Sequence, residues 1–496
     1  MLRRRDMMKR YIFRLRIPIL ALSLYLCVSA FNVFAQETPP APSAPRSVQI
    51  PAVKEKKLAN GLTVAVVERK NVPLVTVQLL IKSGASSEES SEAGLADLTA
   101  SMLTKGTKTR TATQIAEEME FLGGAINAGA GWNNSVVTIT ITSDKLDQAM
   151  AIMADVVFNP AFDQKELELL KSQALDGLKF SLTQPGFLAS YVATRYSFDE
   201  HPAGGTPETL RNLIQSDVAA FHLKNFTPSN GVLIFTGDIS AGDAEKMGNK
   251  YFNTWKSSKI GKVRGTTDRP TMLPSKTVFN RILVIDLPNS GQASVNYGTD
   301  VIKIGRGSTQ YYPSSVLNSL LGGGYSSRLN QEIRIKRGLS YGAGSSFAWR
   351  GDKSNFSTRT QTKNESAAEV VELVVAEIKR LTEGSITEAE LAPRKSVLTG
   401  GFGRNLETTG GLAAAVADLY SFGIPTSELN AYMKNVNGVT DKQIRDFASA
   451  NLLGGDIIIV GDYAEFKNDL AKRFPGMKID VIKADELDLS KVNLRK

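Results

Sequence analysis

The side chains that most often bind zinc in proteins are scarce in this chain. Its 496 residues include two histidines, His201 and His222, and a single cysteine, Cys27. Structural and catalytic zinc sites draw mainly on His and Cys. The sequence also shows no compact Asp-rich loop of the kind that binds Ca²⁺. We therefore predict that this chain binds no metal ion or other cofactor by itself.

A guanidinium and a phenol lie seven residues apart in the second half of the chain. Arg334 falls in the last turn of a predicted helix, Gly338 ends that helix, and Tyr341 enters the next strand. This arrangement would let both side chains converge on one cleft. The alternative is a solvated helix charge at Arg334 and a packed strand aromatic at Tyr341. The residues alone leave both interpretations open.

The elements around these residues occur twice, at a spacing of about 220 residues. A helix followed by an apolar strand that ends in Gly-Asp is found at 216–238 and again at 440–462. Ser216 and Thr440 are the predicted N-caps of the two helices. The repeated order indicates a duplicated unit.

A second pair of segments repeats the order of hairpin, long helix, breaker and further helix. The hairpins are expected at 125–142 and 342–362, the long helices at 144–157 and 366–381, and the further helices from Asp163 and Thr387. We predict an α+β fold with two homologous domains, each an antiparallel-rich sheet packed with helices.

The first 35 residues have the pattern of a signal peptide. A basic stretch precedes the apolar run Ile17–Phe34, and Ala35 ends a cleavage site before Gln36. The alternative is an uncleaved membrane anchor. The predicted organisation is a signal peptide at 1–35, a Pro-rich tether at 36–50, a first domain at 51–256, a linker at 257–276 and a second domain at 277–496.

The positive charge of the chain is concentrated in this leader. Residues 1–35 carry seven basic residues and one acid, so they account for most of the formal charge of +9. The rest of the chain is only slightly basic, and we expect no nucleic-acid partner. Cleavage of the leader would give an exported protein, periplasmic in a Gram-negative source and free of the membrane.

Several motifs, read together over about residues 50 to 465, resemble one peptidase family. They include Leu58–Val64, Gly94–Thr107, Phe226–Asn230, Leu321–Leu329 and Arg334–Tyr341. In this order they are similar to the pitrilysin/insulinase-type (inverzincin) metallopeptidases, in the two-domain bacterial and mitochondrial-processing-peptidase-like branch. The resemblance implies two duplicated domains that form half of a clamshell.

The resemblance also implies that the zinc site of the family is lost. Family members carry H-x-x-E-H on a helix, where two His bind zinc and the Glu polarises a water. Asp97, Ala100 and Ser101 occupy those three positions, and Gly177 stands where the family has its third ligand, a Glu. A single carboxylate binds zinc poorly, so we expect these positions to be a degenerate zinc motif.

Other motif positions imply retained functions. Arg334 and Tyr341 match the family pair that holds the substrate and donates to the developing oxyanion. Asn127, Ala128 and Gly129 match an edge strand that pairs with an extended substrate. The glycine loop Gly322, Gly323 and Gly324 resembles a substrate-admitting loop, although a helix-ending turn is the simpler explanation.

Two functions follow as alternatives. In the first, the chain is the non-zinc-binding subunit of a heteromeric zinc metallopeptidase. A partner chain with H-x-x-E-H would then supply zinc, and the pair would hydrolyse peptides or unfolded polypeptides. In the second, the chain is a catalytically inactive peptide-binding or scaffold protein of an exported complex.

Overall fold

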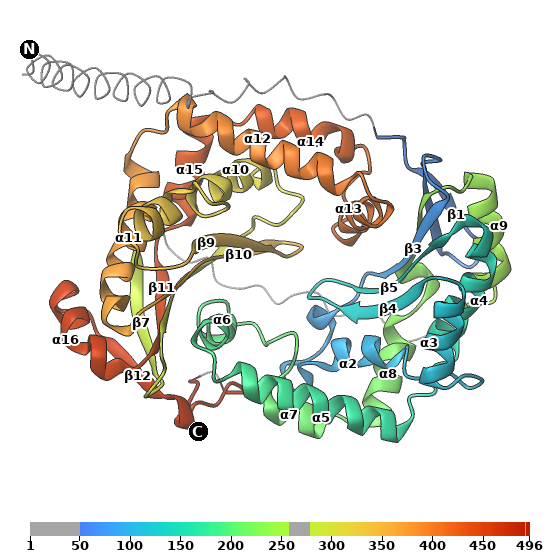
Figure 1. Ribbon diagram of the computed structural model, residues 1–496, viewed down its shortest axis with the longest axis horizontal. Helices are drawn as coiled ribbons and strands as arrows, with labels where there is room; N and C mark the ends of the chain where they lie inside the picture. The colour runs from blue at the N-terminus through green and yellow to red at the C-terminus, as the bar shows by residue number, and fades with distance from the viewer. Residues whose placement is uncertain (1–49, 257–277, 492) are drawn as a thin grey trace, which may run out of the picture. The chain divides into compact units, whose positions relative to one another are not determined.

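The computed structural model describes residues 50–256, 278–491 and 493–496. The predicted signal peptide, the predicted linker and nearly all of the predicted tether lie outside these residues. The described residues form two six-stranded sheets, each with its own set of helices (Figure 1). This arrangement confirms the predicted α+β fold with two similar domains.

The first sheet is mixed and has the spatial order β1-β2-β6-β3-β5-β4. Its strands are β1 (Lys54–Lys57), β2 (Thr63–Glu68), β3 (Leu74–Ile81), β4 (Ala125–Ala130), β5 (Ser135–Thr142) and β6 (Gly231–Gly237). Only β2 and β6 run parallel, and the other neighbours are antiparallel. Every residue of β6 is buried, which fits a strand covered on both faces.

The second sheet has the order β12-β7-β11-β8-β10-β9. Its strands are β7 (Phe279–Asp286), β8 (Ala293–Ile302), β9 (Ala343–Trp349), β10 (Lys353–Thr362), β11 (Gly455–Gly461) and β12 (Ile479–Lys483). Five strands, from β7 to β9 in spatial order, match five of the first sheet in order and direction. The outer strand differs, because β12 is parallel to β7 whereas β1 is antiparallel to β2.

The helices follow the same duplicated order. Those of the first half are α2 (Leu95–Met102), α3 (Ala112–Phe121), α4 (Leu146–Phe158), α5 (Gln164–Ser181), α6 (Pro185–Tyr196), α7 (Pro207–Asn212), α8 (Gln215–Asn225) and α9 (Ala241–Phe252). Those of the second half are α10 (Tyr311–Leu321), the π-helical turn η5 (Asn330–Ile335), α11 (Ala367–Glu383), α12 (Glu388–Asn405), α13 (Thr409–Ser421), α14 (Glu428–Asn437), α15 (Asp441–Asn451) and α16 (Tyr463–Arg473).

Local capping signals explain several helix starts. The side chains of Asp163 and Thr387 accept hydrogen bonds from the first turns of α5 and α12, and both helices begin where the sequence predicts. Thr440 caps α15 in the same way. The prediction for Ser216 is wrong, because α8 begins at Gln215 and Ser216 lies inside its first turn. There the carboxylate of Asp217 accepts a hydrogen bond from the Ile214 N–H at 3.0 Å.

Each half of the chain lends one helix to the sheet of the other half. Helix α13 packs on β3 and β6 of the first sheet, and helix α6 packs on β8 and β11 of the second (Figure 1). Val416 and Val192, on α13 and α6, have no exposed surface. These two valines lie in separate apolar clusters, each of which joins a helix of one half to strands of the other.

Polar contacts fix α13 at its first residue. The Thr409 hydroxyl lies 2.8 Å from the hydroxyl of Thr76 on β3, and the Thr409 carbonyl accepts a hydrogen bond from Thr236 on β6 at 2.8 Å. Both threonines are buried on otherwise apolar strands. The exchange of helices therefore combines apolar burial with specific hydrogen bonds. In the part of the chain that the structure describes, no helix combines the length and the apolar character needed to cross a bilayer.

Candidate functional site

The helix that carries the degenerate zinc motif forms as the sequence predicts. Helix α2 starts after Gly94, whose φ of 95° suits glycine. Asp97 and Ser101 are one helical turn apart and share a face. Asp97 is exposed, Ser101 is half-buried, and Ala100 between them is fully buried. Partial desolvation of its carboxylate raises the pKa of Asp97, although a hydrogen bond with the backbone of Ala130 on β4 opposes the shift.

The residues present here do not fit a zinc ion. Gly177 is exposed on α5, a helix that contacts α2, and a Cβ built there would have no neighbour within 4 Å. A catalytic zinc site needs about three protein ligands, whereas these four positions offer one carboxylate and one hydroxyl. Within the described ranges, no three His, Cys, Asp or Glu side chains form a group able to bind a metal.

A buried carboxylate positions the start of α2. Glu88 accepts hydrogen bonds from the N–H groups of Gly94 and Ala96 at 2.8 and 2.6 Å, where the helix presents unpaired donors. Burial raises the pKa of Glu88 to about 8 despite these donors. His201 lies with its Nδ1 3.6 Å from Glu88 and its ring against Trp132. The sequence alone did not identify this cluster.

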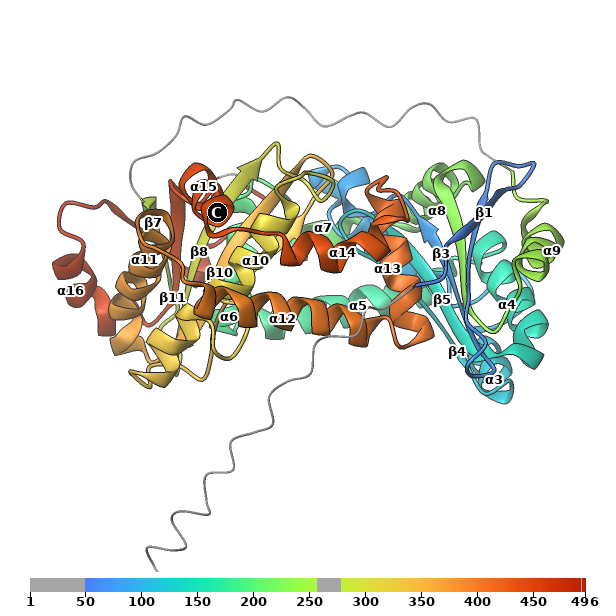
Figure 2. The same cartoon turned by 90° about the horizontal axis from the view of Figure 1, so that it is seen from above.

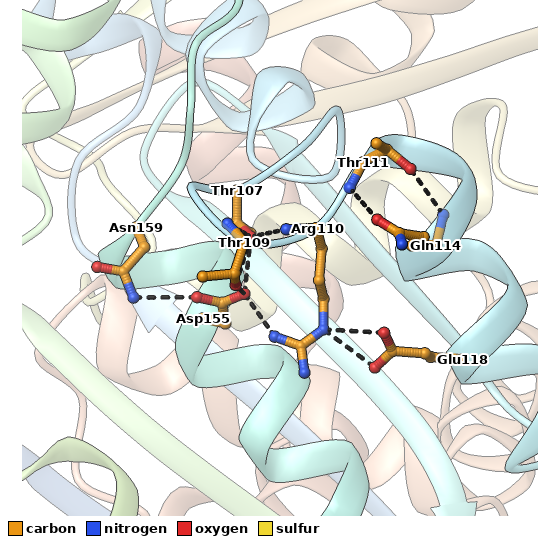
Figure 3. A network of polar contacts seen from close by, with 8 residues as sticks. All are labelled: Thr107, Thr109, Arg110, Thr111, Gln114, Glu118, Asp155 and Asn159. Atoms are coloured by element: carbon orange, nitrogen blue, oxygen red, sulfur yellow. Dashed lines mark hydrogen bonds and ion pairs between the residues drawn. The ribbon is translucent and has the colours of Figure 1, made fainter.

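A second network fixes the segment that follows α2 (Figure 3). Asp155 of α4 accepts hydrogen bonds from Thr107 at 2.8 Å, Arg110 at 2.6 Å and Asn159 at 3.0 Å. Burial alone would raise the pKa of Asp155, but these three donors outweigh burial and lower it. Hydrogen bonds and ion pairs therefore hold the segments on both sides of α2, the helix with the predicted degenerate zinc motif.

The predicted Arg-Tyr pair lies around the end of the π-helical turn η5. The N–H of Gly338, with φ of 64°, donates to the Arg334 carbonyl at 3.0 Å and closes the turn. The Arg334 guanidinium lies 5.0 Å from the centre of the Tyr325 ring. Among the described residues, Arg334 forms no ion pair with a carboxylate. Its charge is therefore not neutralised within this part of the chain.

Tyr341 is one of the most exposed aromatic residues of the structure. It lies two residues before β9, and 89% of its surface is accessible. The alternative of a packed strand aromatic is therefore wrong, and Tyr341 does not belong to the strand. The Ser340 hydroxyl donates a hydrogen bond to the Gly342 carbonyl and accepts one from the Gly342 N–H. These two bonds shape the turn that presents the Tyr341 ring. The ring and its hydroxyl are available to another molecule.

The glycine loop has a packing explanation at two of its three positions. A Cβ at Gly322 would lie 2.2 Å from the Ser345 nitrogen of β9, and one at Gly323 would lie 2.7 Å from the Ser319 Cα of α10. Close backbone approach therefore requires glycine at both. Gly324 has open space around it. The loop ends α10, and its predicted contact with substrate stays a prediction.

The predicted substrate strand is an edge strand. β4 pairs with β5 along one side and is the last strand of the first sheet. Asn127 is exposed and Ala128 and Gly129 are half-buried, and the last two residues add little side-chain bulk to the strand. An edge of this kind can accept a further extended segment by backbone hydrogen bonding. The second sheet has β9 at the matching edge.

The chain matches two models of one peptidase family. The model described as Insulinase (Peptidase family M16) matches residues 63–181, and the one described as Peptidase M16 inactive domain matches residues 212–398. The first match contains α2, β4 and Gly177. The second contains the glycine loop, Arg334 and Tyr341. Together the two matches include parts of both halves of the chain.

Curated and solved proteins give the same result. An uncharacterized zinc protease of Rickettsia felis is 29% identical over 69% of this chain and 81% of its own length. The Non-peptidase homolog YmxG of Helicobacter pylori is 25% identical over 79% of this chain and 90% of its own length. A crystal structure of a peptidase M16 inactive domain from Pseudomonas fluorescens aligns with a TM-score of 0.75 and 26% identity, and the match covers 82% of this chain and 98% of that one.

Proposed function

Because the chain belongs to the insulinase-type M16 peptidase family, we propose that it is the non-zinc-binding subunit of a heteromeric zinc metallopeptidase. The observation that carries the proposal is the contrast between two sites. The α2 site lacks metal ligands, whereas Tyr341 is exposed and Arg334, close to it in the chain, has no carboxylate partner in the described residues.

The two retained side chains would act on a peptide bond that the partner attacks. The Tyr341 hydroxyl would donate a hydrogen bond to the oxyanion that develops on the scissile carbonyl. The Arg334 guanidinium, which is always charged, would bind a substrate carbonyl or carboxylate. A partner with an intact H-x-x-E-H motif would supply the zinc ion and the general base. This division requires the two chains to assemble before hydrolysis occurs.

The substrate would be an extended peptide or an unfolded polypeptide. The free edge of β4 can pair with such a segment through its backbone, and the small side chains at Ala128 and Gly129 leave room for it. Backbone pairing places few demands on side-chain identity. We therefore expect broad substrate use, limited by the requirement for an unfolded segment.

A peptide-binding protein without hydrolytic function is the second candidate. The free edge of β4 supports it as well, and one relative is named a non-peptidase homolog. Under this alternative Tyr341 and Arg334 would contribute at most to binding. The two candidates therefore differ in what the Tyr341 hydroxyl does.

The test combines this chain with an H-x-x-E-H homologue from the same genome and a quenched fluorescent peptide. We expect hydrolysis in the mixture and loss of hydrolysis when zinc is chelated. Tyr341→Phe should lower kcat about 100-fold, the scale measured for one oxyanion donor. Tyr325→Phe is the matched control, because it removes a nearby exposed hydroxyl and keeps the ring beside Arg334. Full activity of Tyr341→Phe would refute the catalytic role, and peptide binding without hydrolysis would favour the second candidate.

A further inference from the structure

A cavity in the second half of the chain is unrelated to the site described above. It is lined by residues of α12, α13 and α14, helices that Figure 2 shows, by Arg306, and by Tyr311 at the start of α10. Its volume is about 470 Å³. Cavities of this size are typical of small-molecule sites. All of its lining residues fall between Arg306 and Tyr432. The lining therefore comes from one half of the chain, although its α13 wall also packs on the first sheet.

Small residues create the space, and aromatic rings form part of the wall. Gly401 of α12 and Ala414 and Ala415 of α13 line the cavity without filling it. Phe402 and Tyr432 stack with their ring centres 4.1 Å apart and nearly parallel. Such a wall accepts an alkyl or aromatic body and excludes water from it.

The charged side chains of the lining are unequal in number. The guanidinium carbon of Arg306 lies 3.7 Å from the centre of the Tyr311 ring, and its Nε donates to Asp418 at 3.1 Å. The second carboxylate, Glu428, has a hydrogen bond from Asn435 but no ion pair within the described part of the chain. Burial raises the pKa of both Asp418 and Glu428, with Arg306 opposing the shift. Two partly desolvated carboxylates thus face one guanidinium.

From this imbalance we propose that the cavity binds a small organic cation, a primary ammonium with an apolar body. The ammonium pairs with Glu428 and Asp418, and the body packs on Phe402 and Tyr432. The aromatic faces add cation–π attraction. A carboxylate ligand is disfavoured, because Asp418 already pairs with Arg306 and Glu428 would repel a second anion.

The test uses three probes of equal length: hexylammonium, hexanol and hexanoate. Isothermal titration of the full chain should show saturable 1:1 binding of hexylammonium, and binding of hexanol at least about tenfold weaker. Hexanoate should not bind. Glu428→Gln should weaken hexylammonium binding by at least about tenfold, because it removes the unpaired charge and keeps the shape. Equal binding of all three probes, or tighter binding of hexanoate, would overturn the proposal.

A filled cavity gives a second test with a matched control. Gly401→Leu adds a bulky side chain to a residue that lines the cavity, and the nearest atom to its Cβ position is on the Arg404 side chain, 3.9 Å away. Gly400→Leu adds the same side chain one residue earlier, outside the lining and also near Arg404. Binding should be lost in the first variant and kept in the second. Unchanged binding to folded Gly401→Leu, checked by circular dichroism, would refute the assignment to this cavity.

Discussion

The two halves of the molecule share one frame and differ where the chemistry would occur. In each half a helical segment ends at a left-handed glycine, Gly123 with φ of 80° or Gly338 with φ of 64°, before the edge strand begins. β4 starts two residues after Gly123, whereas β9 starts five residues after Gly338. The added residues of the second half include Tyr341. The comparison shows that a small insertion into a duplicated frame is enough to present a polar side chain to solvent.

The halves also differ in the ion pairs that hold the segments near the candidate site. In the first, Arg110 bridges Asp155 of α4 and Glu118 of α3 (Figure 3). In the second, Arg328 makes two hydrogen bonds with one carboxylate, Glu390 of α12, at 2.7 and 2.9 Å. Arg328 is nearly buried, but Arg110 keeps about a quarter of its side chain exposed. The second half therefore depends more heavily on a single ion pair.

The exchanged helices should give the largest effects. We expect Val416→Asp and Val192→Asp each to lower the free energy of unfolding by about 4 kcal/mol or more, because each buries a charge without a partner. Since each helix covers the sheet of the other half, both variants should disturb both halves. Urea unfolding followed by fluorescence and circular dichroism measures this. Two separate transitions, with one half unaffected, would contradict the interdependence.

The loop ion pairs should give an intermediate effect that separates the halves. Glu390→Gln removes the carboxylate that forms the ion pair with buried Arg328 in the described residues, so we expect a loss of about 3 kcal/mol. Asp155→Asn is the matched variant, and it should cost less because Arg110 keeps Glu118. Hydrogen bonding to Arg328 lowers the pKa of Glu390. The stabilisation by Glu390 is therefore present above its unfolded pKa and is lost as the pH falls through the lower folded value. Equal losses in the two variants at pH 7 would contradict the difference between the halves.

A titratable residue in one repeat gives the smallest expected effect. His222 of α8 aligns with Ala448 of α15, and burial lowers the pKa of His222 to about 4 although its Nε2 contacts the Val157 carbonyl. The unfolded chain therefore binds a proton between about pH 6.5 and 4 that the folded chain does not. Lowering the pH through this range should therefore reduce the free energy of unfolding by roughly 2–3 kcal/mol.

The measurement compares unfolding at pH 7 and pH 4.5 in wild type and in His222→Ala, which copies the residue of the other repeat. The variant should lose the part of the pH dependence that His222 contributes. NMR titration of the imidazole checks the cause directly. A His222 pKa near 6.5 in the folded protein would remove the basis of this prediction.

The sequence predicts those parts of the fold that local signals determine. The N-cap Thr440, the helix starts at Asp163 and Thr387, and the glycine that ends η5 depend on a few neighbouring residues, and the structure has them where expected. The exchange of α6 and α13 could not be predicted, because an apolar helix face does not specify which sheet it covers. The contact between Glu88 and His201 likewise joins residues that are distant in sequence.

The exchange of helices has a consequence for how the chain is made. Thr76 and Thr409 form a hydrogen bond across 333 positions of sequence. The ribosome releases the strands of the first sheet long before α13 is synthesised, so one face of that sheet lacks its native cover during most of translation. Contacts this distant slow folding and leave apolar strands exposed to aggregation. We expect the nascent first half to need a chaperone until the second half is complete.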